Sequence, residues 1–422
     1  MKLRSSLILL LASLIFVSCS TSPQKKRMVL AIPVYGQSLA LGEEAIRITD
    51  FDTFGTQTNH MVVTENLDEN FGYYSDTHFK QWMKKMLNDH DRAFELSVYG
   101  MAEVVAKHLK EQGYGDSLLI STFPGGQGAT GIADMSKGTK AYKKFIEEIE
   151  VSYQKAKDKG WDFVVPAFCW MQGEDDIVWK KSGNYKKDLK QFQTDLNRDI
   201  KAITKQRADV VCITYQTNCL TLSKEFNENN FSGRETEIPQ AQLELINEDD
   251  LFIPSGPTYP YSFVGERVHI DGISQKRLGY LAGLSVIRLL DSKPAKGLYP
   301  IGFSISGDTV LVRFNVPTPP LVLDTIAVKY AANHGFSVID STNTNILKKV
   351  FLKDNVLKLY CKKSPSGAKT RYAVNGIKDK SGPKYGPRGN LRDSQGELLS
   401  TTIANKVYPL HNWSYQFDVL VK

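Results

Sequence analysis

Between residues 28 and 291, short apolar runs alternate with stretches of helical periodicity, and this alternation restricts the fold more than any other feature of the chain. Four runs have the length and composition of buried strands, and they occupy residues 28–34, 118–122, 163–170 and 210–215. Such strands, separated by long crossovers, are typical of a parallel sheet that is covered by helices on both faces. We therefore expect an α/β fold, a three-layer α/β/α sandwich, with ligands bound at the carboxyl ends of its strands.

Two stretches between these runs carry apolar stripes at a spacing of 3.6 residues, which predicts helices that pack on the sheet. One stripe ends at Gly160 and consists of Tyr142, Phe145, Ile146, Ile149, Tyr153 and Ala156. The other consists of Tyr185, Leu189, Phe192, Leu196 and Ile200. Residues 50–91 are rich in Thr, Asn and Asp, and we interpret them as an insertion over the end of the first strand.

After residues 292–297 the apolar period changes from 3.6 to two. Residues 301–314 and 351–361 each predict a hairpin, and residues 415–421 alternate to the end of the chain. A chain of 422 residues is long enough for more than one domain of about 100 to 200 residues. We expect an α/β domain at residues 28–291 and a small β-sandwich-like C-terminal domain at residues 298–422.

The first 19 residues have the pattern of a signal peptide. Lys2 and Arg4 precede an apolar run at residues 7–17, which is too short to cross about 30 Å of hydrocarbon as a helix. The following Ser18-Cys19 resembles the lipobox of bacterial lipoproteins, which implies that Cys19 carries lipid and that residues 20–27 form a polar leash. The implied location is the cell envelope, at the periplasmic side of a membrane or at the cell surface. The alternative is ordinary signal cleavage beside an incidental cysteine.

The composition excludes several classes of protein. Apolar residues make up 41% and charged residues 23%, which is typical of a chain with a sizeable core and not of a disordered one. Lys plus Arg exceed Asp plus Glu by only seven, which is too few to indicate a nucleic-acid partner. The cysteines after Cys19 lack metal-site spacing, so we interpret them as core residues and expect no metal and no cofactor; they are Cys169, Cys212, Cys219 and Cys361.

Three segments place reactive side chains at the predicted carboxyl edge. The first strand runs into residues 35–40, Tyr-Gly-Gln-Ser-Leu-Ala, which puts Ser38 just beyond a strand end. The third run continues into residues 170–176, Trp-Met-Gln-Gly-Glu-Asp-Asp. Residues 266–272 open the last helix and contain His269, with acids three residues before it and two after it. A serine, a histidine and an acid are the parts of an acyl-transfer site.

These motifs are similar to those of the SGNH (GDSL-type) hydrolase superfamily, and within it to the sialate O-acetylesterase and acetylxylan esterase branch. The motifs of that branch are Gly-Gln-Ser-(Asn), Gly-Gly-Thr-Ser-Ile, Trp-x-Gln-Gly-Glu and Asp-x-x-His, and the likeness covers about residues 28–291. Trp-x-Gln-Gly-Glu is specific, whereas Gly-Gln-Ser alone is weak. Two positions depart from the pattern, because Leu39 stands where Asn is common and Glu266 replaces the usual Asp.

The resemblance implies a role for each matching residue. Ser38 corresponds to the nucleophile, His269 to the general base and Glu266 to the acid that orients the histidine. Asp271 remains open as an alternative acid, although its place before a helix also suits an N-cap.

The resemblance also implies an oxyanion site, which stabilises the negative charge that develops on the attacked carbonyl oxygen. The implied donors are the backbone N–H groups of Ser38 and Gly128 and the side-chain amide of Gln172, with Gly126 as the alternative to Gly128. The neighbouring acids at residues 174–176 are interpreted as a solvated loop.

One literal match to the superfamily's name is rejected by its context. Residues 115–118 read Gly-Asp-Ser-Leu, but they join the end of a helix to the start of a strand. Ser117 is therefore predicted at the edge of the sheet opposite the ligand site.

The sequence thus predicts an exported lipoprotein that hydrolyses acetyl esters on a glycan or oligosaccharide through a serine nucleophile. Its expected contact with the membrane is the N-terminal lipid alone. Two alternatives use the same residues: a catalytically degenerate glycan-binding lipoprotein, and a polysaccharide O-acyltransferase in which a sugar accepts the acyl group in place of water. No residue pattern identifies the glycan or the acylated hydroxyl.

Overall fold

The computed structural model describes residues 27–49, 62–63, 94–114, 117–179, 183–227, 234–294, 297–353 and 355–421. The predicted signal peptide, Cys19, most of the leash and nearly all of the predicted insertion at residues 50–91 lie outside these ranges.

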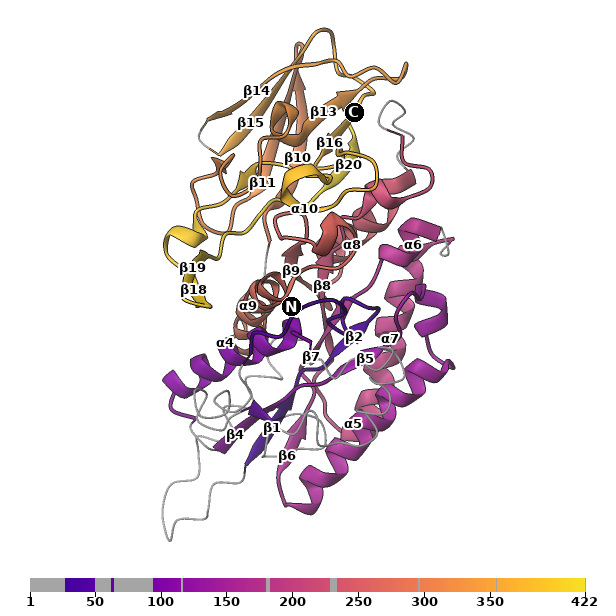
Figure 1. The fold of residues 1–422 in the computed structure, drawn as a ribbon, viewed down its shortest axis with the longest axis vertical. Helices are drawn as coiled ribbons and strands as arrows, with labels where there is room; N and C mark the ends of the chain where they lie inside the picture. Colours follow the sequence, from indigo (N-terminus) through magenta and orange to yellow (C-terminus); the bar gives the residue numbers. More distant parts are fainter. Residues whose placement is uncertain are drawn as a thin grey trace.

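A parallel sheet forms the centre of the first region (Figure 1). Three of its five long strands are each interrupted by two residues, which divides the hydrogen-bonded pairing into two sets of strands. The interrupted strands are β1 (Met28–Ala31) with β2 (Val34–Gly36), β4 (Leu118–Ser121) with β5 (Pro124–Gly126), and β6 (Asp162–Val164) with β7 (Ala167–Met171). The other two are β8 (Val211–Gln216) and β9 (Phe252–Pro257), and short β3 (Val62–Val63) pairs with β4. Two breaks contain Pro33 or Pro166, which lack an N–H, yet their carbonyls still accept from Cys169 N at 2.8 Å and Val211 N at 3.0 Å.

The order across the sheet is β4/β5, β1/β2, β6/β7, β8, β9, with every neighbouring pair parallel. This is a doubly wound order in which the chain reverses its direction of progress beside β1/β2, and ligands bind at such reversal points. The predicted parallel sheet is confirmed. Strand β9 was not predicted from the sequence because its two prolines and one glycine argue against a strand, and they are tolerated here at the edge of the sheet.

Helices cover both faces of the sheet (Figure 1). One face packs on α4 (Ser97–Glu111) and α9 (Gly272–Leu290), and the other on α5 (Lys140–Asp158), α7 (Tyr185–Thr204) and α8 (Glu237–Glu248). Short α6 (Glu174–Trp179) follows β7. Both predicted stripes are confirmed as core contacts on α5 and α7, although Ile146 and Tyr153 are only partly buried.

Helices α4 and α9 approach each other closely because their contact is lined by glycine. A Cβ on Gly279 would lie 1.9 Å from the carbonyl oxygen of Ser97, so no larger residue fits there without separating the helices. Helix α9 is thereby held against α4. Because α9 begins at Gly272, this packing also fixes the end of the segment that carries His269.

The C-terminal region consists of antiparallel sheets, as its period of two predicts. One sheet contains β10 (Tyr299–Ser306), β11 (Thr309–Asn315), β15 (Val356–Cys361) and β14 (Leu347–Lys353), and another contains β13 (Phe336–Ile339), β16 (Lys369–Tyr372) and β20 (Phe417–Leu420). Smaller elements are β12 (Val322–Leu323) with β17 (Leu391–Arg392), β18 (Ser400–Ile403) with β19 (Lys406–Pro409), and α10 (Gly382–Tyr385). The rings of Phe303 and Phe417 pack between the two main sheets with centroids 5.7 Å apart, so the β-sandwich prediction is confirmed, while the exact domain boundaries stay a prediction.

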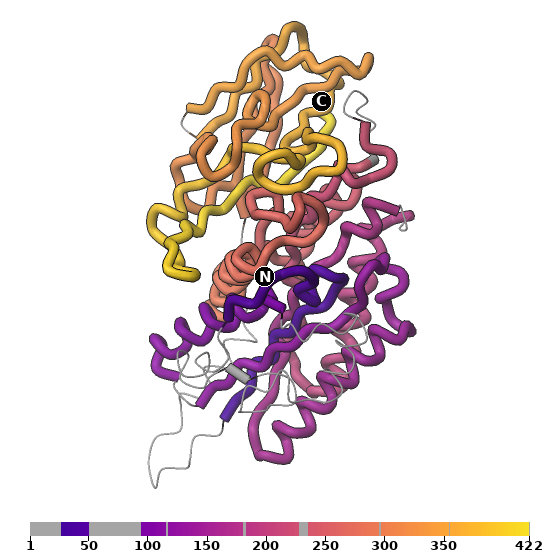
Figure 2. The backbone as a smooth tube through the Cα atoms, viewed as in Figure 1, coloured from indigo at the N-terminus to yellow at the C-terminus, as the bar shows by residue number. Residues whose placement is uncertain are grey.

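The C-terminal sheets lie beyond the carboxyl ends of the central strands (Figure 1), and Figure 2 shows the orange and yellow part of the chain stacked against the earlier part. The last residue of β8, Gln216, is joined there to Gln416, just before β20. The side chain of Gln216 donates to the Gln416 carbonyl at 2.9 Å and accepts from its N–H at 2.7 Å. The C-terminal region is thus fixed to the edge of the sheet at which ligands are expected.

The four cysteines at positions 169, 212, 219 and 361 are buried and unpaired, as predicted for core residues. Burial raises the pKa of the Cys169 thiol to about 12. Within the described ranges, every helix is too short or too polar to cross a membrane.

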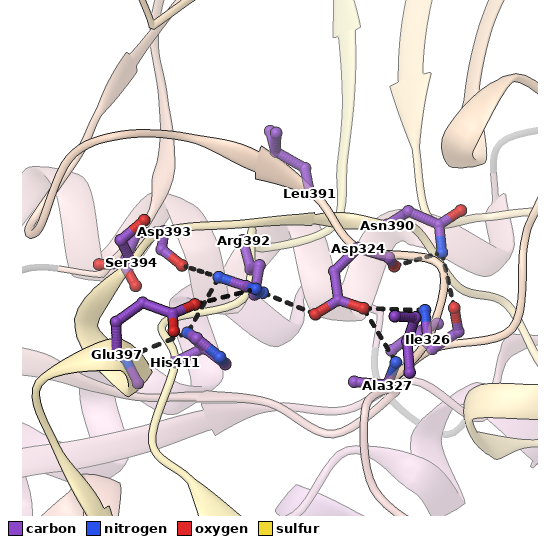
Figure 3. A network of polar contacts seen from close by, with 12 residues as sticks. Asp324, Ile326, Ala327, Asn390, Leu391, Arg392, Asp393, Ser394, Glu397 and His411 are labelled. Carbon is purple, nitrogen blue, oxygen red and sulfur yellow. Dashed lines mark hydrogen bonds and ion pairs between the residues drawn. The ribbon is translucent and has the colours of Figure 1, made fainter.

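A buried polar network connects the loops of the C-terminal region around Arg392 (Figure 3). The guanidinium of Arg392 donates to Asp324 at 2.7 Å and lies 3.2 Å from a carboxylate oxygen of Glu397. The Nδ1 atom of His411 accepts from Arg392 at 3.2 Å and from the N–H of Gly396 at 3.1 Å. Burial, and next the charge of Arg392, lower the pKa of His411.

We predict that acidification from pH 8 to pH 5 destabilises the wild-type protein more than it destabilises His411→Asn. Because the pKa of His411 is lower in the folded chain, the unfolded chain takes up the proton first. The resulting stability is complete above the ordinary histidine pKa of about 6.5 and declines as the pH falls toward the folded value. Asparagine can accept a hydrogen bond but does not titrate. Urea unfolding midpoints at both pH values measure the difference, and equal losses in the two proteins would exclude His411 as the cause.

Candidate active site

Ser38 lies in the turn that follows β2, and the approach of three strands positions it. A Cβ on Gly36 would lie 2.0 Å from the carbonyl oxygen of Met171, so only glycine lets β2 end this close to β7. The N–H of Gln37 then donates to the same carbonyl at 3.0 Å. Ser38 is 4% exposed and sits at the carboxyl edge of the sheet, as predicted.

His269 reaches Ser38 from a loop far along the chain. Its Nε2 atom lies 2.8 Å from the Ser38 Oγ. The loop is a narrow hairpin in which Val264 N donates to the His269 carbonyl at 2.7 Å and Asp271 N donates to the Ser262 carbonyl at 3.0 Å. Helix α9 begins immediately afterwards, so the histidine is anchored on both sides. This contact is the one that a general base and a serine nucleophile require.

The acid that contacts the other ring nitrogen is Glu44, which was not predicted. Its Oε2 atom lies 2.7 Å from the His269 Nδ1, in the same turn that carries Ser38. Glu44 has a φ of 62°, a left-handed conformation. A second acid, Glu43, has an oxygen 3.9 Å from the His269 Nε2. The only signal in the sequence was the pair of adjacent acids five and six residues after Ser38, and this pair matches none of the family motifs quoted above.

The prediction that Glu266 orients His269 is wrong in this structure. The loop turns at Gly265 and Glu266, both with a φ of 59°, and the Glu266 carboxylate pairs with Lys380 Nζ at 2.9 Å. Asp271 does not contact the ring either, because its side chain caps α9 by accepting from Ser274 N at 2.8 Å. The N-cap interpretation of Asp271 is therefore confirmed.

Two backbone N–H groups at this edge of the sheet are available as donors, because Ser38 and Gly128 follow the parallel neighbours β2 and β5. Among the described residues, neither the N–H of Ser38 nor that of Gly128 has an acceptor. Gly128 begins a turn that is closed by the Thr130 hydroxyl, which donates to the Gly128 carbonyl at 2.7 Å. Gly126 serves a different purpose, because a Cβ at its φ of 120° would lie 1.7 Å from the Gly36 carbonyl oxygen. Its absence of a side chain lets β5 approach β2 closely.

The predicted role of Gln172 as a side-chain oxyanion donor does not agree with its contacts. Gln172 is fully buried, and its Nε2 donates to Asp176 at 2.6 Å and to the Thr130 carbonyl at 3.3 Å. Its Oε1 accepts from the Tyr185 hydroxyl at 2.9 Å. Both N–H groups of the amide are thus engaged within the protein. A local motif specifies the residue but cannot specify the direction in which its amide points.

The interpretation of residues 174–176 as a solvated loop is also wrong. They form the first turn of α6, and all three acids are buried. Glu174 accepts from the Tyr215 hydroxyl at 2.6 Å and from the Thr217 hydroxyl at 2.6 Å. Burial raises the pKa of Glu174, and these hydrogen bonds, together with the charge of His269, partly oppose that rise. The network was not predicted because its hydroxyl donors, Tyr215 in β8 and Thr217 just after it, come 41 and 43 residues later in the chain.

Ser117 lies at the edge of the sheet that its position between a helix and a strand predicts. It precedes β4 at the amino end of that strand, and its hydroxyl donates to the Tyr114 carbonyl. The Gly-Asp-Ser-Leu match therefore lies at the edge of the sheet opposite Ser38, as predicted.

Comparisons with known proteins show the family and the fold to which this chain is similar. A family model described as "Carbohydrate esterase, sialic acid-specific acetylesterase" matches residues 56–281. A solved carbohydrate acetylesterase from Xanthomonas citri is 11% identical with a TM-score of 0.57, and the match covers 93% of this chain and 80% of that one. A solved protein from Arabidopsis thaliana is 14% identical with a TM-score of 0.43, covering 62% of this chain and 98% of its own. No curated protein matches the chain by sequence. The Xanthomonas match shows that the likeness in fold includes the C-terminal sheets.

We predict that Glu44→Gln lowers kcat for p-nitrophenyl acetate by about 10- to 1,000-fold, because an amide no longer fixes the histidine tautomer or stabilises the imidazolium. The loss should be smaller than at a buried acid, since the Glu44 side chain is 54% exposed and water shares its role. Glu266→Gln is the matched control and should leave kcat within about twofold. Steady-state kinetics on both variants measure the effect, and a larger loss in Glu266→Gln than in Glu44→Gln would return the orienting role to Glu266.

Proposed function

Because the chain belongs to the carbohydrate esterase, sialic acid-specific acetylesterase family, we propose that it removes acetyl groups from carbohydrate hydroxyls by a serine nucleophile mechanism. The observation that carries this proposal is the chain of contacts from Ser38 through His269 to Glu44, with distances of 2.8 Å and 2.7 Å. A hydrogen-bonded serine, histidine and carboxylate in this order is the arrangement that activates a hydroxyl for acyl transfer.

The first half of the reaction transfers the acetyl group to the enzyme. The Ser38 Oγ attacks the ester carbonyl carbon while His269 Nε2 accepts the hydroxyl proton. The carbonyl oxygen becomes an oxyanion that accepts hydrogen bonds from the N–H groups of Ser38 and Gly128. His269 then donates its proton to the sugar oxygen, the carbon–oxygen bond of the ester breaks, and the free sugar hydroxyl leaves.

The second half repeats the same proton transfers with water. Water gives a proton to His269 Nε2 and attacks the acetyl carbon, and the oxyanion again accepts from the two backbone N–H groups. The bond to Ser38 breaks, the proton returns to the serine, and acetate is released. The Glu44 carboxylate stabilises the imidazolium that forms in each half.

The departures from the family pattern at Leu39 and Glu266 favour the alternative in which the chain is a catalytically degenerate binding protein. This alternative loses support, since Glu44 supplies the carboxylate that Glu266 does not. Leu39 is 1% exposed and packs in the core, so it leaves the Ser38–His269 contact intact.

We predict that Ser38→Ala abolishes the release of acetate from acetylated saccharides while the protein remains folded. Loss of the nucleophile should lower kcat on the order of 1,000-fold or more, because no acyl-enzyme can form. Ser117→Ala is the matched control and should retain wild-type activity. The measurement is acetate release from acetylated xylan, from O-acetylated sialic acid and from p-nitrophenyl acetate, with circular dichroism to monitor folding. Equal activity of Ser38→Ala and wild type would refute the mechanism.

We also propose that the protein is a lipoprotein of the cell envelope, on the strength of the signal-peptide pattern and the Ser18-Cys19 pair. Acyl chains stabilise membrane attachment by about 0.8 kcal/mol per buried CH₂ group. The substitution Cys19→Ser should therefore move the exported protein from the membrane fraction to the soluble fraction, with its esterase activity retained. Fractionation and immunoblotting measure this, and unchanged membrane association would rule out Cys19 as the anchor.

A further inference from the structure

A buried acid beside the candidate oxyanion site has no part in the mechanism described above. Asp176 lies in the first turn of α6 and is 3% exposed. Its Oδ2 accepts two short hydrogen bonds, from the backbone N–H of Ile132 at 2.9 Å and from Gln172 Nε2 at 2.6 Å. One carboxylate oxygen thus connects the loop after β5 to the end of β7.

The same loop presents the backbone donor Gly128. The turn from Gly128 to Thr130 is closed by the Thr130 hydroxyl, and Ala129 has a positive φ of 50°. Two atoms at the end of this turn are fixed from outside, because the Thr130 carbonyl accepts from Gln172 and the Ile132 N–H donates to Asp176. At the start of the turn, the Gln127 N–H donates to the Gly36 carbonyl at 3.1 Å, so the segment with the Gly128 N–H is held by β2 at its start and by these two contacts at its end.

Asp176 also determines the orientation of the Gln172 amide. A carboxylate only accepts hydrogen bonds, so it requires the NH₂ end of the amide to face it. At the other end, Oε1 lies 2.9 Å from the Tyr185 hydroxyl, which can donate to it in this orientation and which also lies 2.8 Å from the Gln172 carbonyl oxygen. With the amide reversed, its oxygen would face the Asp176 carboxylate and the Thr130 carbonyl, and neither contact would be satisfied.

We propose that Asp176 is a positioning residue that acts through Gln172 and Ile132 to hold the Gly128 N–H where the oxyanion develops. The inference rests on the proposed function and deepens it, because it assigns Gln172 to the support of the oxyanion loop. Asp176 does not touch the substrate. A displaced donor weakens the transition state more than the bound ester, since the negative charge exists only in the former.

The test compares Asp176→Ala with Asp176→Asn in the full-length protein. Removal of one oxyanion donor typically costs about 100- to 1,000-fold in kcat, so a displaced donor in Asp176→Ala should cost about 10- to 100-fold, with KM for p-nitrophenyl acetate within about twofold. Asp176→Asn should recover most of this loss, because one amide oxygen can occupy the position of Oδ2 and accept both bonds. Phenylboronic acid, which forms a tetrahedral adduct with a nucleophilic serine, should bind more weakly by the same factor as kcat falls.

Asp199→Asn is the matched control, because Asp199 is also a carboxylate that connects two parts of the chain by hydrogen bonds but, among the described residues, makes none to the turn of Gly128. Asp199 accepts from Tyr142 at 2.8 Å and from Lys137 at 2.7 Å between α5 and α7, so its substitution should leave kcat and boronate binding unchanged. Wild-type kcat in Asp176→Ala, or a loss that appears in KM and not in boronate binding, would overturn the assignment. If Asp176→Ala does not fold, Asp176→Ser decides, because its shorter side chain cannot reach both donors: matched falls in kcat and boronate binding support the assignment, and unchanged kcat overturns it.

The outcome is separable from that of the proposed function. Activity that survives Ser38→Ala would refute the serine mechanism whatever Asp176 does. An inactive Ser38→Ala beside a fully active Asp176→Ala would refute only the positioning role.

Discussion

The close approach of β2 to both of its neighbours is the constraint on which the rest of the site depends. Gly36 lies between β5 and β7, and the neighbouring carbonyl of Met171 leaves no room for a side chain. This spacing brings three strand ends together at one edge. Ser38 follows the first, the loop with Gly128 follows the second, and Gln172 follows the third. Parallel pairing makes this convergence unavoidable, since all carboxyl ends then face the same way.

The residues around the nucleophile divide into two groups of different physical character. Ser38 is buried, but the hydrogen bonds through His269 lead to the surface at Glu44, whose side chain is 54% exposed. Gln172 and Asp176, by contrast, are buried, and the Gln172 amide donates to the Asp176 Oδ2 inside the protein. Buried networks of this kind are rigid, because an unpaired polar group would be costly there. The first group reaches solvent through Glu44 and is suited to exchanging protons, whereas the second group is buried and suited to holding a loop in place.

The C-terminal sheets are connected to the same edge and do not form a separate appendage. Gln216 at the end of β8 is bonded to Gln416, and Glu266 in the loop of His269 pairs with Lys380. The backbone N–H of Ser381 also donates to the Glu266 carbonyl at 2.8 Å. This backbone contact, which does not depend on the Glu266 carboxylate, holds the histidine loop against the C-terminal region, while Glu44 in the turn of Ser38 supplies the acid for the ring.

The sequence by itself determined the parallel sheet, the two helical stripes, the C-terminal hairpins and the positions of Ser38 and His269, because periodicity and strand-end placement are local properties of a chain. It also separated Ser38 from Ser117, since chain direction alone assigns them to opposite edges. Only the tertiary structure decided that Glu44 contacts the ring, that Glu266 turns toward Lys380 and that Gln172 faces Asp176. Glu44 and His269 are 225 residues apart, and their contact depends on loop dihedral angles that no local pattern encodes.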